Sequence, residues 1–191
     1  QNQSGVRGYV GDLIDLSSVT GSGTLEGGEN MQMLFDGSTD TKFLEVATPT
    51  EDDPVWVSFQ LTEPKVITTY SICAGNDSQP RDPADWILYG SADGNDWVEL
   101  DKREGESFYA RKQENIYTFE NDTAYAYYKI SVTKKQAADN CTQFSELRLG
   151  TGEGEMFVTS TGSGGAVGSL SNFIDRTSVE GTTSFDNENK F

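Results

Sequence analysis

The sequence predicts an all-β fold built as an antiparallel β-sandwich or jelly roll. Residues 55–61, VWVSFQL, alternate apolar and polar side chains with period two, the pattern of a strand with one buried face. Several more short apolar segments occur along the chain, separated by clusters of turn residues. Apolar spacing of three and four residues is not sustained over any long window, so no helix is expected.

The expected strands follow one another through the middle of the chain. Residues 1–30 are rich in Gly, Ser and acidic residues and are expected to contribute at most one strand. After 55–61 come the β-branched and aromatic segment 66–74 and then WILYGS at 86–91. The sequence Asp93-Gly94-Asn95 between two apolar segments predicts a hairpin turn. The remaining expected strands are VEL at 98–100 and the segments 115–119, 125–132, 144–150 and 156–159.

The large aromatic side chains are expected in the core rather than at a binding site. They lie inside or at the ends of apolar strand patterns, and large aromatic residues dominate sandwich cores. The expected core aromatics are Trp56, Trp86, Trp97, Tyr125, Tyr127 and Tyr128.

Composition restricts the classes of partner and chemistry. The chain carries 31 acidic and 14 basic residues, a formal net charge of −17, which disfavours DNA, RNA and anionic membrane surfaces. It contains no histidine, so Ser-His-Asp and Cys-His catalysis and His-ligated zinc are excluded. Glycoside hydrolysis by two carboxylates stays formally open, but no feature of the sequence selects such a pair.

The segment LFDGSTDTKF, residues 34–43, concentrates oxygen-bearing side chains between apolar residues. A surface turn in which Asp36 bonds its own backbone would have this composition. A loop wrapped around a hard cation such as calcium, which prefers oxygen ligands, would have it too.

Five segments, in order, resemble the discoidin family, also called coagulation-factor type C domains, and its bacterial galactose-binding-like carbohydrate-binding modules. They are LFDGSTDTKF, VWVSFQLTEPKVITTYSI, DWILYGSADGNDWVEL, YYKISV and FSELRLG. The resemblance covers about residues 10–150. It implies a galactose-binding-domain-like jelly roll with loops clustered at one end, and binding without catalysis.

The resemblance implies a structural calcium ion in the 34–43 segment. In the family, a loop of this kind and a late strand supply the oxygen ligands, from carboxylates, hydroxyls and backbone carbonyls. Phe43 stands where the family usually has Trp, and Ser38 where Asn or Asp is common. Carried over to this chain, the ligands would be Met33, Asp36, Ser38, Thr41, Ser145 and Glu146.

The ligand end is expected around the loop CAGNDSQPRDPADW, residues 73–86. Sugar sites combine an apolar surface for the ring with a few fixed polar groups for the hydroxyls. Arg81 could bind vicinal hydroxyls, or it could pair with Asp77 or Asp82 and only brace the loop. The candidate ligand-binding residues are Phe43, Leu44, Asn76, Asp77, Arg81, Asp82, Tyr109, Arg111 and Asn140.

The two cysteines, Cys73 and Cys141, are an even but uninformative count. In the fold that the resemblance implies, residues 138–144 lie beside the 73–82 loop. A disulfide between the two cysteines would then brace the ligand end, and two unlinked thiols are the alternative.

Three regions are expected: a lead-in at 1–9, the module at 10–150, and a Gly- and Ser-rich tail at 151–191. Within the tail, NFIDRTSVEGTTSF at 172–185 resembles MLFDGSTDTKF at 33–43, and TGSG precedes both. The tail could begin a second copy of the module or add extra strands, or the match could be a coincidence.

The expected function is a non-catalytic carbohydrate-binding module of a secreted or cell-surface, bacterial protein, with galactose-type glycans as candidate ligands. Further modules of the same polypeptide are candidate partners. A protein-binding adhesion domain and a structural spacer of a larger glycan-processing enzyme are the alternatives. Membrane binding ranks low because the ligand loops carry Asp77, Asp82 and Asp139.

Overall fold

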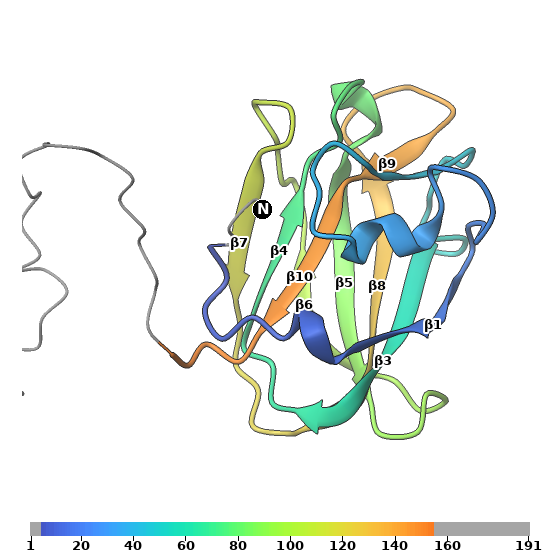
Figure 1. Cartoon of the computed structure of the whole chain (residues 1–191). Helices are drawn as coiled ribbons and strands as arrows, with labels where there is room; N and C mark the ends of the chain where they lie inside the picture. Colours follow the sequence, from blue (N-terminus) through green and yellow to red (C-terminus); the bar gives the residue numbers. More distant parts are fainter. Residues whose placement is uncertain (1–4, 155–191) are drawn as a thin grey trace, which may run out of the picture. The chain divides into compact units, whose positions relative to one another are not determined.

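The chain folds as a β-sandwich, which the computed structural model describes over residues 5–154 (Figure 1). The predicted strand at 156–159 and the repeated segment at 172–185 lie outside these residues. The strands within residues 5–154 are β1 (Ile14–Gly21), β2 (Phe43–Glu45), β3 (Val55–Lys65), β4 (Thr69–Cys73), β5 (Pro83–Ser91), β6 (Val98–Arg103), β7 (Glu114–Thr118), β8 (Tyr125–Lys135), β9 (Thr142–Phe144) and β10 (Glu146–Gly150).

The strands form three antiparallel sheets. One has five strands in the order β1-β3-β8-β5-β6, one has three in the order β10-β4-β7, and β2 pairs with β9. In the large sheet Phe59 lies opposite Tyr128, and Leu88 lies opposite Ile130. The all-β antiparallel fold predicted from the alternating pattern is therefore confirmed.

The helical elements within residues 5–154 are three short 3₁₀ turns: η1 (Gly11–Leu13), η2 (Met31–Phe35) and η3 (Gln79–Arg81). Each spans five residues or fewer, too few for a repeating apolar pattern to show in the sequence. The described part of the chain has no helix of the length and apolar character needed to span a membrane.

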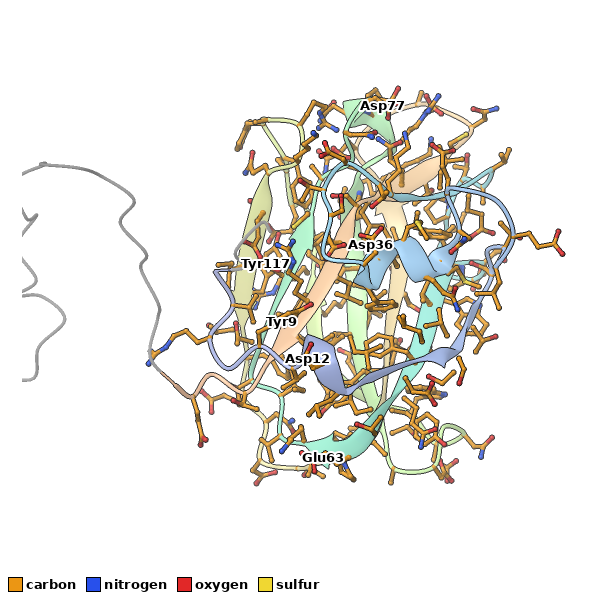
Figure 2. All side chains as sticks on the ribbon, in the orientation of Figure 1. Tyr9, Asp12, Asp36, Glu63, Asp77 and Tyr117 are labelled. Atoms are coloured by element: carbon orange, nitrogen blue, oxygen red, sulfur yellow. The ribbon has the colours of Figure 1, made fainter. Side chains whose placement is uncertain are left out.

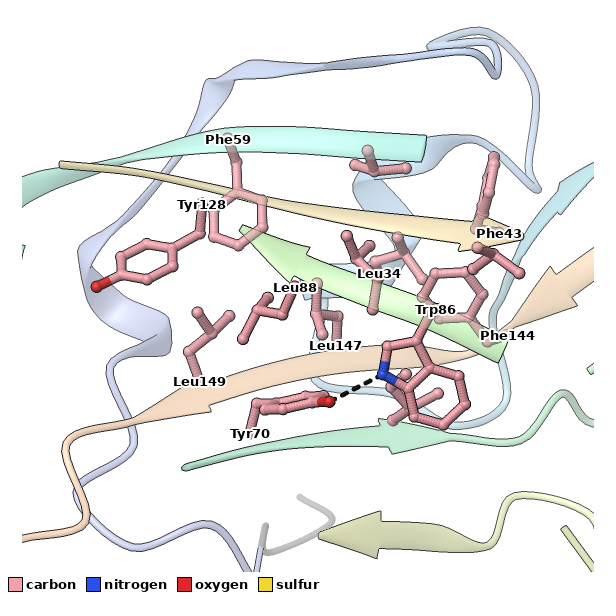
Figure 3. Close-up of a cluster of buried hydrophobic side chains, with 14 of the residues drawn as sticks. Leu34, Phe43, Phe59, Tyr70, Trp86, Leu88, Tyr128, Phe144, Leu147 and Leu149 are labelled. Carbon is pink, nitrogen blue, oxygen red and sulfur yellow. Dashed lines mark hydrogen bonds between the residues drawn. The ribbon is translucent and has the colours of Figure 1, made fainter. Parts of the chain in front are cut away.

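The core lies between the five-stranded and three-stranded sheets, as Figure 3 shows. Phe59, Trp86 and Tyr128 reach into it from the large sheet. Leu147 and Leu149 meet them from β10. Trp86 Nε1 donates a hydrogen bond to Tyr70 Oη at 2.8 Å, so the polar group of the largest core side chain is satisfied.

Three of the aromatic residues expected in the core lie elsewhere. Val55 and Val57 face inward, so Trp56 between them faces the outer side of the sheet and is half-buried. Trp97 is also half-buried, and its ring lies 4.4 Å from Lys129 Nζ, which also lies 4.8 Å from the Tyr89 ring. The prediction of core positions was therefore wrong for Trp56 and Trp97, and also for the half-exposed Tyr127.

Residues 5–9 of the lead-in pack along β10. Val10 N donates to Leu149 O at 3.0 Å, and Tyr9 forms an isolated bridge with Gly150. Val6 is buried against the sandwich. The segment expected at 144–150 is divided at Ser145 into β9 and β10, and this break lets the chain pass from one sheet to another.

Tyr70→Phe is expected to destabilise the fold by about 1–3 kcal/mol, because the buried Trp86 N–H loses its acceptor. Tyr127→Phe, on the half-exposed outer face, is the matched control and is expected to change stability by less than about 0.5 kcal/mol. Urea unfolding followed by tryptophan fluorescence measures both. Equal midpoints for the two variants would contradict the assignment.

Candidate functional site

The loop after η2 carries a cluster of oxygen atoms. Asp36 is the C-cap of η2, and Gly37 follows with φ of +76°, a left-handed conformation that favours glycine. Asp36 Oδ1 accepts a hydrogen bond from Ser38 N at 2.8 Å, so the turn that the composition suggested is present. Thr41 Oγ1 lies 2.6 Å from Asp36 Oδ2 and 3.0 Å from the Ser38 carbonyl oxygen.

Glu146 reaches this loop from β10 and is fully buried, at 0% exposure. Its Oε1 accepts hydrogen bonds from Gly37 N at 3.1 Å and Ser38 N at 3.2 Å. Its Oε2 accepts one from Arg148 Nε at 3.2 Å. Burial raises the pKa of Glu146 to about 8; Arg148 opposes this rise and the nearby Asp36 carboxyl adds to it.

Four of the six residues predicted to hold a cation are thus brought together: Asp36, Ser38, Thr41 and Glu146. Met33 and Ser145 flank the cluster in sequence, but neither has a hydrogen bond to it within residues 5–154. No group of three His, Cys, Asp or Glu side chains suited to a metal occurs in that range. Two carboxylates, a hydroxyl and a carbonyl still fit a hard cation, provided that carbonyls or waters complete its shell.

The second group of predicted residues lies at the end of the sandwich where Figure 2 labels Asp77. There the 74–82 loop meets the segments before β7 and β9 (Figure 1). Ala137 N donates to Pro80 O at 3.1 Å, and Gln143 Nε2 donates to Asp77 O at 2.8 Å. The expected proximity of residues 138–144 to the 73–82 loop is confirmed.

Arg111 and Asp82 brace this end and are not free to face a ligand. Arg111 Nη2 lies 2.5 Å from Asp82 Oδ2, and Arg111 Nη1 donates to Asp77 O at 2.6 Å. Asp82 is fully buried, and its Oδ1 accepts from Gly75 N at 3.1 Å. Burial raises the pKa of Asp82, while Arg111 opposes that rise.

Arg81 pairs with a residue other than Asp77 and Asp82, the two partners that the sequence analysis considered. Its Nε lies 3.1 Å from Asp139 Oδ1, an oxygen that also accepts from Cys141 N at 2.9 Å. The backbone N–H of Cys141, and after it Arg81, lower the pKa of Asp139. Neither Nη group of Arg81 has a partner among residues 5–154, so both can donate to a ligand.

Asp77 is paired with a lysine that the sequence analysis did not single out. Lys42 is 4% exposed, and its Nζ lies 2.6 Å from Asp77 Oδ1, 3.0 Å from Gln143 Oε1 and 3.5 Å from Glu29 Oε1. The hydrogen bond from Lys42 lowers the pKa of Asp77. No motif marks this lysine, because its acceptors come from three distant parts of the chain.

The other predicted ligand residues differ in exposure. Tyr109 is 91% exposed, and Asn76 and Asn140 are also exposed at the same end. Leu44 is half-buried in the β2–β9 ladder. Phe43 is 0% exposed, with its ring 5.8 Å from that of Phe144 in a T-shaped arrangement, so its prediction as a ligand contact was wrong.

Cys73 and Cys141 are free thiols, so the candidate disulfide is corrected to the alternative of two unlinked cysteines. Cys73 Sγ lies 3.5 Å from Arg148 Nη1 on the three-stranded sheet, and Cys141 Sγ lies 3.4 Å from Asn140 Oδ1 at the loop end. The two side chains therefore face different surroundings. Burial raises the pKa of Cys73 to about 12, which makes its thiol unreactive.

Comparison with known proteins places the chain among related domains. The F5/8 type C domain model matches residues 18–147. A peptide-N(4)-(N-acetyl-beta-glucosaminyl)asparagine amidase from Arabidopsis thaliana is 30% identical over 113 residues, which cover 55% of this chain and 15% of the amidase. The match therefore spans only a small part of that relative's length.

Two solved structures from Clostridium perfringens share the fold. CpGH89CBM32-5, in complex with GalNAc-β-1,3-galactose, has a TM-score of 0.60 and 13% identity over 74% of this chain and 98% of its own. The family 32 carbohydrate-binding module of NanJ, in complex with galactose, has a TM-score of 0.58 and 11% identity over 74% and 97%. The jelly-roll sandwich is thus the fold of known carbohydrate-binding modules.

The raised pKa of Glu146 predicts that the free energy of unfolding of the metal-free protein, measured in a chelator, depends on pH. Its folded pKa of about 8 lies above the ordinary 4.5, so the folded state keeps a proton that the unfolded chain has lost. The stability that this group contributes is full below about pH 4.5 and is lost as pH rises to about 8. Glu146→Gln should remove that fall, as thermal unfolding at several pH values would reveal. Parallel curves for the two proteins would contradict the assignment.

Proposed function

The chain belongs to the F5/8 type C domain family, and from this premise we propose that it is a non-catalytic carbohydrate-binding module. The observation that carries the proposal is the loop end, where exposed groups of the kinds that bind sugars stand on a frame of ion pairs in which Lys42 and Asp82 are buried. A site prepared in this way loses little entropy when it binds.

Four residues supply the proposed contacts. The Tyr109 ring, 91% exposed, offers an apolar face for a pyranose ring. The two free Nη groups of Arg81 can donate to vicinal hydroxyls. Asn76 and Asn140 add amide donors and acceptors at the same end.

Galactose-type sugars are the first ligands to test. The two Clostridium perfringens modules with this fold were solved with GalNAc-β-1,3-galactose and with galactose. In this chain Arg111 pairs with Asp82, and Lys42 pairs with Asp77. The Nη groups of Arg81, which have no partner within residues 5–154, can bind neutral hydroxyls as well as charged groups. We place the module in a secreted or cell-surface protein, where binding would hold attached modules on the glycan.

A structural calcium ion is the second part of the proposal. Asp36, Ser38, Thr41 and Glu146 would hold it, with the carbonyls of Met33 and Ser145 completing the shell. The ion would supply positive charge between the Asp36 and Glu146 carboxyl groups, where the Asp36 carboxyl adds to the raised pKa of Glu146. It would also tie the 36–41 loop to the last strand.

The glycan proposal predicts that Tyr109→Ala and Arg81→Met each lower affinity at least about tenfold. Val98→Ala is the matched control, because Val98 is 48% exposed and follows the hairpin at the far end of β5. A glycan array with the wild-type chain in calcium identifies the sugar, and calorimetry with that sugar measures the variants.

A blank array from the folded protein would contradict sugar binding. A protein ligand for which free sugars do not compete would instead favour the adhesion alternative, which the exposed Tyr109 and the 73% exposed Val46 also suit.

The calcium proposal predicts that Asp36→Ala lowers the melting temperature by about 5 °C or more in calcium, and much less in chelator. Asp53→Ala, an exposed aspartate outside both candidate sites, is expected to lower it in neither. Scanning fluorimetry with and without chelator measures both variants. Equal losses for Asp36→Ala in the two conditions would rule out the ion.

A further inference from the structure

The candidate cation loop and the candidate glycan loops are in direct contact. Asn76 Nδ2 donates to the Asp40 carbonyl at 2.8 Å, and the Asp40 carboxylate pairs with Lys112. Two residues further along, Lys42 Nζ lies 2.6 Å from Asp77 Oδ1. Residues 40–42, which surround the proposed cation ligand Thr41, therefore hold the loops that would bind the sugar.

Lys42 is the strongest of these links. The Asp40–Lys112 pair is largely exposed, and exposed pairs contribute little because water and salt screen them. The Lys42 side chain is 5% exposed, and a buried ammonium has to keep its acceptors. Its position is therefore fixed by Asp77 and Gln143 rather than averaged over many rotamers.

Gln143 extends the contact from Lys42 to the backbone of the glycan loop. Its side chain is fully buried, with Oε1 3.0 Å from Lys42 Nζ. Its Nε2 lies 2.8 Å from the carbonyl oxygen of Asp77 and 3.2 Å from that of Ser78. Movement of Lys42 would consequently disturb both the side chain and the backbone of residues 77–78.

We propose that Lys42 is a positioning residue that couples cation binding to the order of the 75–82 loop. The inference rests on the proposed function, since it takes the ion at Asp36 and Glu146 and the loop as the glycan site. An ion that fixes Thr41 also fixes the backbone of the next residue, Lys42, and with it Asp77 and Gln143. Because coupling free energies are reciprocal, sugar binding would tighten the cation by the same factor.

Hydrogen–deuterium exchange of the whole chain, with calcium or with chelator, tests this without any sugar. In the wild type, calcium should slow exchange in residues 36–42 and also slow it about fivefold or more in residues 75–82. In Lys42→Met the first effect should stay, and the second should fall below about twofold. Lys134→Met, which loses only a 4.0 Å surface pair with Asp85, should behave as the wild type.

The outcomes separate the coupling from the proposed function. If calcium slows residues 36–42 but not 75–82 in the wild type, the ion binds and the coupling is wrong. Retention of the effect at 75–82 in Lys42→Met would overturn the role of Lys42 alone. Slowing at neither segment would overturn the calcium site and the coupling with it.

A second variant keeps the test decisive if Lys42→Met does not fold. Asp77→Ala removes the carboxylate that accepts from Lys42, and the Asp77 side chain lies on the exposed side of this pair. The backbone carbonyl of residue 77 can still accept from Arg111 and Gln143. This variant should also lose the calcium effect at 75–82. An unchanged effect there would contradict the proposal.

Discussion

The burial of one carboxyl group, that of Glu146, dictates how the 36–41 loop is arranged against the last strand. It lies on the last strand, fully buried, and its partners are the amides of Gly37 and Ser38, more than a hundred positions earlier in the chain. An ionised carboxylate in such a place needs donors or a cation. The 36–41 loop supplies the amide donors that Glu146 accepts from. It also supplies the further oxygen atoms that a cation beside Glu146 would need. The same loop then continues into residues 40–42, which contact the candidate glycan loops.

The loop end divides its polar residues into two roles. One group is buried or half-buried and forms its hydrogen bonds within the group and with loop carbonyls; it consists of Arg111, Asp82, Lys42 and Gln143. Tyr109, Asn76 and Asn140 stand exposed, and Arg81 keeps two donor groups free. A frame of paired charges that presents a few exposed polar and aromatic groups is typical of a preorganised binding site.

Much of the fold was predictable from the sequence, because alternation with period two reports directly on which face of a strand is buried. The same rule also contained the correct position of Trp56: Val55, Val57 and Phe59 share one face, so Trp56 must lie on the other. Phe43 was not predictable in this way, because β2 has three residues and cannot display an alternation. The partners of Arg81 and Lys42 could not be predicted either, since Asp139 and Gln143 approach them only after the loops fold. In the candidate cation loop, the oxygen-bearing residue types of the 34–43 segment predicted the cluster. The participation of Glu146, far along the chain, was predicted only by the family resemblance.

We propose that one hard cation joins the 36–41 loop to Glu146. The most direct measurement is anomalous diffraction from crystals grown in calcium. A bound calcium ion should give a single strong peak within coordination distance of oxygen atoms from Asp36, Thr41 and Glu146, about 2.3–2.6 Å from each. A map with no peak there, in which Glu146 keeps its bonds to the Gly37 and Ser38 amides, would contradict it.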